Sequence, residues 1–218
     1  PPDHNYPLGI WSGSMIGYVR NLLTLEGLAY AIYDYPDMVE DMVETLCVLE
    51  EDFLDQVLPH IDFDFAESWE DICYKGGPLV SIDFFKNIIV PRYKRIGNKL
   101  HAAGIDVWYV DCDGDVGPIV PLFLDGGINC MFPHEVNSCG HPSELLNEYG
   151  KDLRIMGGVD KMALGEGPKA IKQYLKTLLP LVERGGYIPF CDHLCPPNVK
   201  PEDYLYYLDL KEKMFGMQ

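Results

Sequence analysis

Acidic side chains and histidines recur in this sequence directly after short apolar runs, where a strand would end and a loop begin. Six such strand ends are recognisable in the 218 residues: 11–13, 67–71, 111–115, 134–135, 157–160 and 191–195. Carboxylates that converge on one edge of a sheet raise each other's pKa or require a cation. A single aspartate in such a place is more often a helix N-cap, but that explanation would have to hold separately at every one of these ends.

The carboxyl ends of parallel strands meet at the same edge, which is where barrel enzymes place their reactive groups. We therefore predict one cavity at this edge, lined by Glu67, Asp111, Asp113, Glu135 and His193. The residues for which we expect catalytic roles are His193, Glu67, Glu135 and Asp115.

The last strand end reads Cys191-Asp192-His193-Leu194-Cys195, with a spacing that suits a metal. Residues two apart in an extended segment point the same way, so the two cysteines and His193 could reach one ion. A zinc site usually draws its ligands from more than one segment. The alternative is a histidine that faces a substrate, flanked by inert cysteines. The run at 111–115 superficially resembles a calcium loop, but it lacks the distal glutamate of such a loop.

The elements that must position these groups alternate between strand and helix along the whole chain. Apolar runs at 6–13, 62–67, 106–111, 128–132, 153–157 and 187–190 predict strands, and apolar residues at helical spacing separate them. Six such units indicate a parallel sheet with right-handed crossovers. We predict an α/β fold, a TIM-type (β/α)8 barrel shortened at its N-terminus, as one domain over 1–218, because a closed barrel has eight units. An open doubly wound sheet is the alternative, although no Gly-rich phosphate motif follows the first strand.

Composition excludes several classes of partner. A formal charge of −17 repels phosphate backbones, so we expect no nucleic acid. The chain has no run of about 18 apolar residues and no signal-peptide pattern, which predicts a cytoplasmic protein away from membranes. Seven cysteines in a chain of this length indicate reduced core thiols rather than a disulfide framework.

Four stretches together resemble the uroporphyrinogen decarboxylase superfamily. They are 65–81 (FAESWEDICYKGGPLVS), 110–116 (VDCDGDV), 149–161 (YGKDLRIMGGVDK) and 185–199 (GGYIPFCDHLCPPNV). The likeness runs from about residue 6 to about residue 214, with the same order and spacing throughout. It implies a barrel whose site lies at the carboxyl mouth.

The superfamily contains two chemistries. True decarboxylases remove acetate carboxyls from a porphyrinogen without a metal, and His193 matches the histidine that they place near the substrate. Their arginine-rich segment has no counterpart here, and none of the five arginines belongs to one of the strand ends. The zinc-dependent relatives instead move methyl groups between a methylated substrate, a corrinoid protein and an acceptor thiol.

The metal ligands of those methyltransferases correspond to Asp111, Asp113 and His193. The resemblance therefore implies a divalent metal, either zinc or a harder ion that prefers carboxylates. We favour a methyltransferase-like enzyme acting on a methylated small molecule, with a corrinoid on a partner protein as methyl carrier. The alternatives are a uroporphyrinogen decarboxylase of porphyrin biosynthesis and a barrel that has lost activity and serves as a subunit. A homodimer is one assembly that the sequence allows.

Overall fold

The structure is a computed structural model and describes residues 5–216. The backbone divides into two compact units, a first unit of residues 1–130 and a second of residues 131–218. The expectation of one domain over the whole chain stays a prediction.

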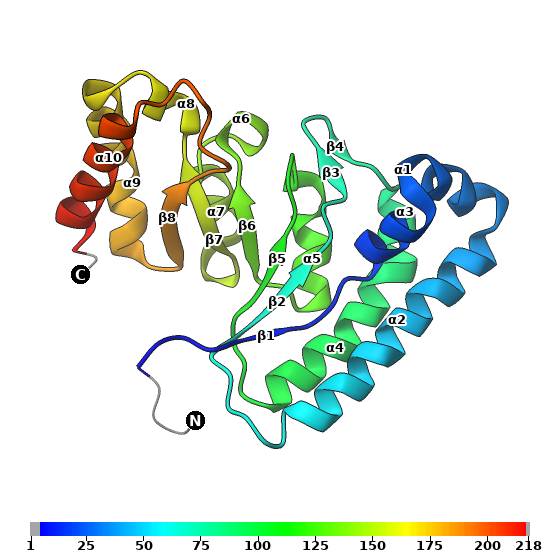
Figure 1. The fold of residues 1–218 in the computed structure, drawn as a ribbon. Coiled ribbons are helices and arrows are strands. Elements are labelled where there is room, and N and C mark those ends of the chain that lie inside the picture. Colours follow the sequence, from blue (N-terminus) through cyan, green and yellow to red (C-terminus); the bar gives the residue numbers. More distant parts are fainter. Residues whose placement is uncertain (1–4, 217–218) are drawn as a thin grey trace. The chain divides into compact units, whose positions relative to one another are not determined.

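Three parallel strands form the sheet of the first unit: β1 (Gly9–Trp11), β2 (Phe65–Trp69) and β5 (Trp108–Asp111). They are adjacent in chain order, as the strand–helix alternation predicts (Figure 1). Alternate residues such as Ile10, Ala66 and Val110 are buried, because successive side chains of a strand point to opposite faces. Their neighbours Glu67 and Asp111 are half-buried on the other face.

Helices cover the buried face of this sheet. The elements are α1 (Ile16–Asp34), α2 (Pro36–Val57), α3 (Ile82–Phe84), a π-helical turn (Phe85–Ile89), α4 (Val90–Ala102), a 3-10 turn (Gly117–Ile119) and α5 (Val120–Gly126). Ser81 caps the third helix, since its hydroxyl accepts the Phe84 N–H at 3.1 Å. Pro91 lies in the first turn of α4, directly after the π turn, where it has no N–H to continue the α-helical ladder. A short antiparallel hairpin, β3 (Cys73–Tyr74) and β4 (Gly77–Pro78), was not predicted.

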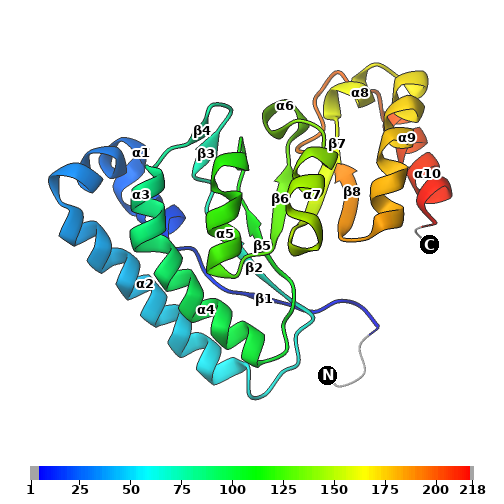
Figure 2. The same cartoon turned by 180° about the vertical axis from the view of Figure 1, so that it is seen from behind.

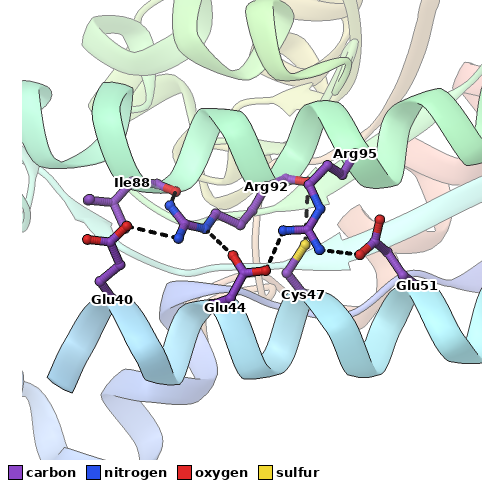
Figure 3. A network of polar contacts seen from close by, with 7 residues as sticks. All are labelled: Glu40, Glu44, Cys47, Glu51, Ile88, Arg92 and Arg95. Atoms are coloured by element: carbon purple, nitrogen blue, oxygen red, sulfur yellow. Dashed lines mark hydrogen bonds and ion pairs between the residues drawn. The ribbon is translucent and has the colours of Figure 1, made fainter. Parts of the chain in front are cut away.

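Helices α2 and α4 are joined by a network of ion pairs beside their apolar contact (Figure 3). Arg92 pairs with Glu40 and Glu44, both at 2.9 Å. Arg95 pairs with Glu44 at 2.5 Å and also with Glu51. The hydrogen bond from Arg95 lowers the pKa of Glu44, against the opposing effect of burial. All the acids belong to α2 and all the bases to α4, so the two helices recognise each other by charge.

Glu50 lies on the buried side of α2, next to the end of β1. A side chain placed on Gly13 would come within 2.8 Å of Glu50 Oε2. Among the described residues, Glu50 Oε1 has no hydrogen-bond partner. Burial raises the pKa of Glu50 to about 7, since an ionised carboxylate is poorly solvated there.

This shift predicts a pH-dependent stability. The folded state disfavours the charged form, so the free energy of unfolding should fall by about 3 kcal/mol in total as the pH rises from 4.5 to about 7. Glu50→Gln should remove this dependence and stabilise the protein by a similar amount at pH values above 7. Urea unfolding on either side of that range, followed by circular dichroism, measures both effects. Glu26→Gln, at an exposed position of α1, is the matched control and should change neither.

The second unit repeats the same strand–helix alternation. Its strands are β6 (Cys130–His134), β7 (Arg154–Val159) and β8 (Tyr187–Cys191), in that order, and β7 and β8 are parallel. Its helices are α6 (Val136–Cys139), α7 (Ser143–Tyr149), α8 (Lys161–Gly165), α9 (Pro168–Arg184) and α10 (Pro201–Phe215), with a 3-10 turn at Gly150–Asp152. Figure 2 shows α9 and α10 side by side at the C-terminal end of the chain.

The fold class is thus α/β with parallel strands and intervening helices, as predicted. No closed barrel is formed by the strands between residues 5 and 216. In the same part of the chain, no helix has both the length and the apolar composition needed to cross a membrane.

Candidate functional site

The carboxyl ends of β1, β2 and β5 lie together at one edge of the first unit. Parallel pairing places Trp11 beside Glu67 and Trp69 beside Asp111. Glu67 also lies beside Tyr109, and the two side chains form a hydrogen bond. Burial raises the pKa of the Tyr109 phenol, and the hydrogen bond to Glu67 and the charges of Glu67 and Asp111 raise it further. Two predicted site residues, Glu67 and Asp111, are therefore brought together with a tyrosine that the sequence analysis missed.

The loop after β5 carries the other two predicted aspartates of this unit. Asp115 Oδ1 accepts the Gly117 N–H at 3.0 Å, so its carboxylate starts the 3-10 turn. The Asp115 N–H donates to Tyr74 O at 3.0 Å, which attaches the loop to the hairpin β3–β4. Gly114 has a φ of 84°, and a Cβ there would lie 2.7 Å from the Tyr74 backbone. These contacts give Asp115 a structural role in the loop, and its catalytic role stays a prediction. Asp113 lies half-buried in the same loop.

Glu70 follows β2 and is fully buried. Its carboxylate accepts the N–H groups of Met15, Ile16 and Gly17 at 2.8–2.9 Å, at the start of α1. It also accepts a hydrogen bond from the Tyr93 hydroxyl. Burial raises the pKa of Glu70, and these hydrogen bonds oppose the rise. Glu70 thus joins the end of one strand to the start of the helix that precedes it in the chain.

Arg20 is brought to the same edge by α1, although the sequence places no arginine in a strand end. Its guanidinium pairs with the Asp71 carboxylate at 3.2 Å and also donates to Asp71 O. It lies over the Trp69 ring, 5.0 Å from the centroid. Asp71 has a φ of 48°, a left-handed conformation unusual for aspartate, and the contacts to Arg20 hold it there. Arg20 reaches this edge because the fold of α1, rather than distance along the sequence, decides which cations approach a strand end.

In the second unit, an ionic cluster joins the carboxyl ends of β6, β7 and β8. Lys161 Nζ lies 2.9 Å from Glu135 Oε1 and 3.8 Å from Asp192 Oδ1. Burial lowers the pKa of Lys161, but the hydrogen bond to Glu135 and the two negative charges outweigh it, so the net shift is upward. Of these three residues, only Glu135 was among the predicted site residues.

Asp192 is the buried centre of this cluster. Its two carboxylate oxygens accept the N–H of Val136 at 2.9 Å and of Lys161 at 3.0 Å, at the starts of α6 and α8. Burial raises the pKa of Asp192, and these hydrogen bonds and Lys161 lower it again in part. One carboxylate therefore positions two loops, including the backbone next to Glu135.

His193 follows directly and is half-buried. The strand ends at Cys191, and residues 192–194 form a bend. The expectation that Cys191, His193 and Cys195 lie in one extended segment is therefore wrong, because Asp192 turns inward to bind the two helix starts. Cys191 is half-buried and Cys195 exposed.

The predicted metal ligands belong to both units: Asp111 and Asp113 to the first, and His193 to the second. Within residues 5–216 no group of three or more His, Cys, Asp or Glu side chains is arranged to hold a metal ion. The shared cavity and the ligand set stay predictions.

Comparison with known proteins identifies a similar fold, but no similar sequence. No family model matches the chain, and no curated protein matches it. A solved structure of a methyltransferase from Methanosarcina mazei is similar, with a TM-score of 0.69 and 17% sequence identity over 98% of this chain. The chain spans 60% of the length of that methyltransferase. Over nearly its whole length, then, this chain has the fold of part of a methyltransferase.

Proposed function

We propose that the chain is part of a (β/α) barrel of the uroporphyrinogen decarboxylase superfamily that transfers methyl groups with the help of a divalent metal. The observation that carries the proposal is the similarity in fold to a solved methyltransferase over 98% of the chain. The motifs that resemble the methyltransferase branch of the superfamily support the same class. A methylated small molecule is the proposed substrate, and a corrinoid protein the proposed partner.

In residue type, the proposed donor set suits a divalent metal. Asp111 ends β5 and Asp113 lies two residues further, both half-buried, and His193 follows β8 as the nitrogen donor. Two carboxylates and one imidazole suit zinc and also harder ions such as manganese. When bound, the metal would supply a Lewis acid that activates the methyl acceptor or the leaving group.

The remaining residues have roles that their contacts suggest. The Lys161 ammonium, 2.9 Å away, keeps Glu135 ionised, so its carboxylate can accept a hydrogen bond from the methyl acceptor. Glu67 is oriented by its hydrogen bond with Tyr109. Tyr109 in turn is half-buried and offers a hydroxyl next to Asp111.

The test compares metal binding and methyl transfer in the purified protein. Titration with zinc and with manganese is expected to show one site, and His193→Ala should lower both metal content and transfer of a methyl group from methylcobalamin to a thiol, by about 100-fold or more for transfer. Cys195→Ala, two residues away and exposed, is the control and should change both much less.

Titration with uroporphyrinogen is run in parallel. Tight porphyrinogen binding without metal uptake would overturn the methyltransferase proposal and favour the decarboxylase alternative. Methyl transfer that is unchanged in His193→Ala would remove His193 from the metal site.

A further inference from the structure

Helix α2 carries two apolar stripes, one fully buried and one partly exposed. The covered stripe contains Val39, Val43, Cys47 and Leu54, all fully buried. The second, the exposed α2 stripe, consists of Met38, Met42, Leu46, Leu49 and Phe53, at helical intervals of four, four, three and four residues. Leu49 is 65% exposed, Met38 43% and Phe53 41%, while Met42 and Leu46 between them are half-buried. In both views of the chain, α2 is the outermost long helix of the first unit (Figures 1 and 2).

The exposed α2 stripe has an acidic edge. Asp41 lies three residues after Met38, and Asp52 lies three residues after Leu49, so each carboxylate neighbours the stripe on the helix surface. Both aspartates are exposed. In the part of the chain that the structure describes, neither takes part in an ion pair. No Lys or Arg occurs between Arg20 and Lys75.

The buried side of α2 shows which kind of helix packs against an apolar stripe with acidic neighbours. There α4 supplies apolar side chains together with Arg92, Arg95 and Lys99, which pair with acids of α2. Lys99 Nζ, for example, lies 2.5 Å from Asp55 Oδ1. Helix α2 therefore already makes one apolar contact in which basic residues of the other helix pair with its own acidic residues.

We propose that the exposed α2 stripe binds an amphipathic helix of a partner protein, whose apolar face is edged by lysine or arginine. Asp41 and Asp52 are eleven residues apart, which is about 16 Å along a helix, so two basic residues at that spacing would reach both. A second copy of this chain fits less well. A symmetric contact would place the same acidic edge on both sides, in a protein whose net charge is −17.

The experiment measures binding of two synthetic helical peptides with the same leucine face. One carries lysines eleven residues apart along the edge of that face, and the other carries glutamates there. By fluorescence anisotropy, the lysine peptide should bind the wild-type chain and the glutamate peptide should not. Leu49→Lys should abolish binding, and Asp41→Asn together with Asp52→Asn should weaken it about tenfold, which corresponds to about 1.4 kcal/mol.

Leu205→Lys is the matched control, since Leu205 is also 65% exposed but lies on α10. Lysine-peptide binding that survives Leu49→Lys, or that Leu205→Lys lowers equally, would overturn the proposal. So would sedimentation equilibrium showing a dimer that Leu49→Lys dissociates, because the stripe would then be covered by a second copy. None of these outcomes depends on methyltransferase activity.

Discussion

Replacing Glu70 by alanine is expected to destabilise the first unit by about 3 to 5 kcal/mol. The carboxylate accepts three backbone N–H groups from the start of α1 and a hydrogen bond from the Tyr93 hydroxyl. Alanine would leave all these donors buried without an acceptor, and each buried orphan donor costs about 1 to 3 kcal/mol. Urea unfolding followed by far-UV circular dichroism measures the loss.

Two variants show whether the hydrogen bonds are the cause. Glu70→Gln keeps one oxygen and the side-chain shape, so it should lose clearly less stability than alanine. Tyr93→Phe removes only the phenolic donor and should lose the least. Equal losses for alanine and glutamine at position 70 would mean that the negative charge or the second acceptor oxygen, rather than side-chain volume, makes Glu70 important, because glutamine keeps the volume of glutamate.

Asp192→Ala should cost about 3 kcal/mol and loosen two loops of the second unit. Its oxygens hold the N–H groups of Val136 and Lys161, and its charge lies 3.8 Å from the Lys161 ammonium. Hydrogen exchange should therefore accelerate by about 100-fold at those two amides. Amides within α9 should exchange at rates that follow only the global change in stability.

Asp192→Asn separates the two possible causes of this effect. Asparagine has one acceptor oxygen, so one of the two amides should stay protected while the other exchanges faster. Fast exchange at both amides in the asparagine variant would show that the attraction between the Asp192 and Lys161 charges, rather than the two hydrogen bonds, holds the loops.

The periodicity of apolar residues was enough to predict the strand–helix order and the parallel pairing within the first unit. Local patterns carry this information because a half-buried strand and an amphipathic helix differ in repeat. Strand boundaries shifted by a few residues: the second strand is Phe65–Trp69 where 62–67 was expected. The hairpin β3–β4 escaped prediction because two-residue strands have no periodicity to detect.

The candidate site was predictable only as a set of residue types at strand ends. Asp111 and Glu135 lie where the pattern puts them, at the carboxyl ends of β5 and β6, whereas Glu67 lies in the middle of β2 because that strand continues to Trp69. Their partners were not predictable. Tyr109 meets Glu67 and Lys161 meets Glu135, each from another element, and packing decides which side chain meets which carboxylate.

Glu70 and Glu67 show why side-chain partners could not be predicted from the sequence. The two residues are three positions apart, and the sequence predicted only Glu67 to line the candidate site. Folding buries Glu70 completely against the N–H groups of α1 and leaves Glu67 half-buried beside Tyr109. Residue type and strand period are local properties that a sequence displays. Burial and hydrogen-bond partners depend on distant segments, so only the tertiary structure decides which carboxylate supports the fold and which faces the candidate site.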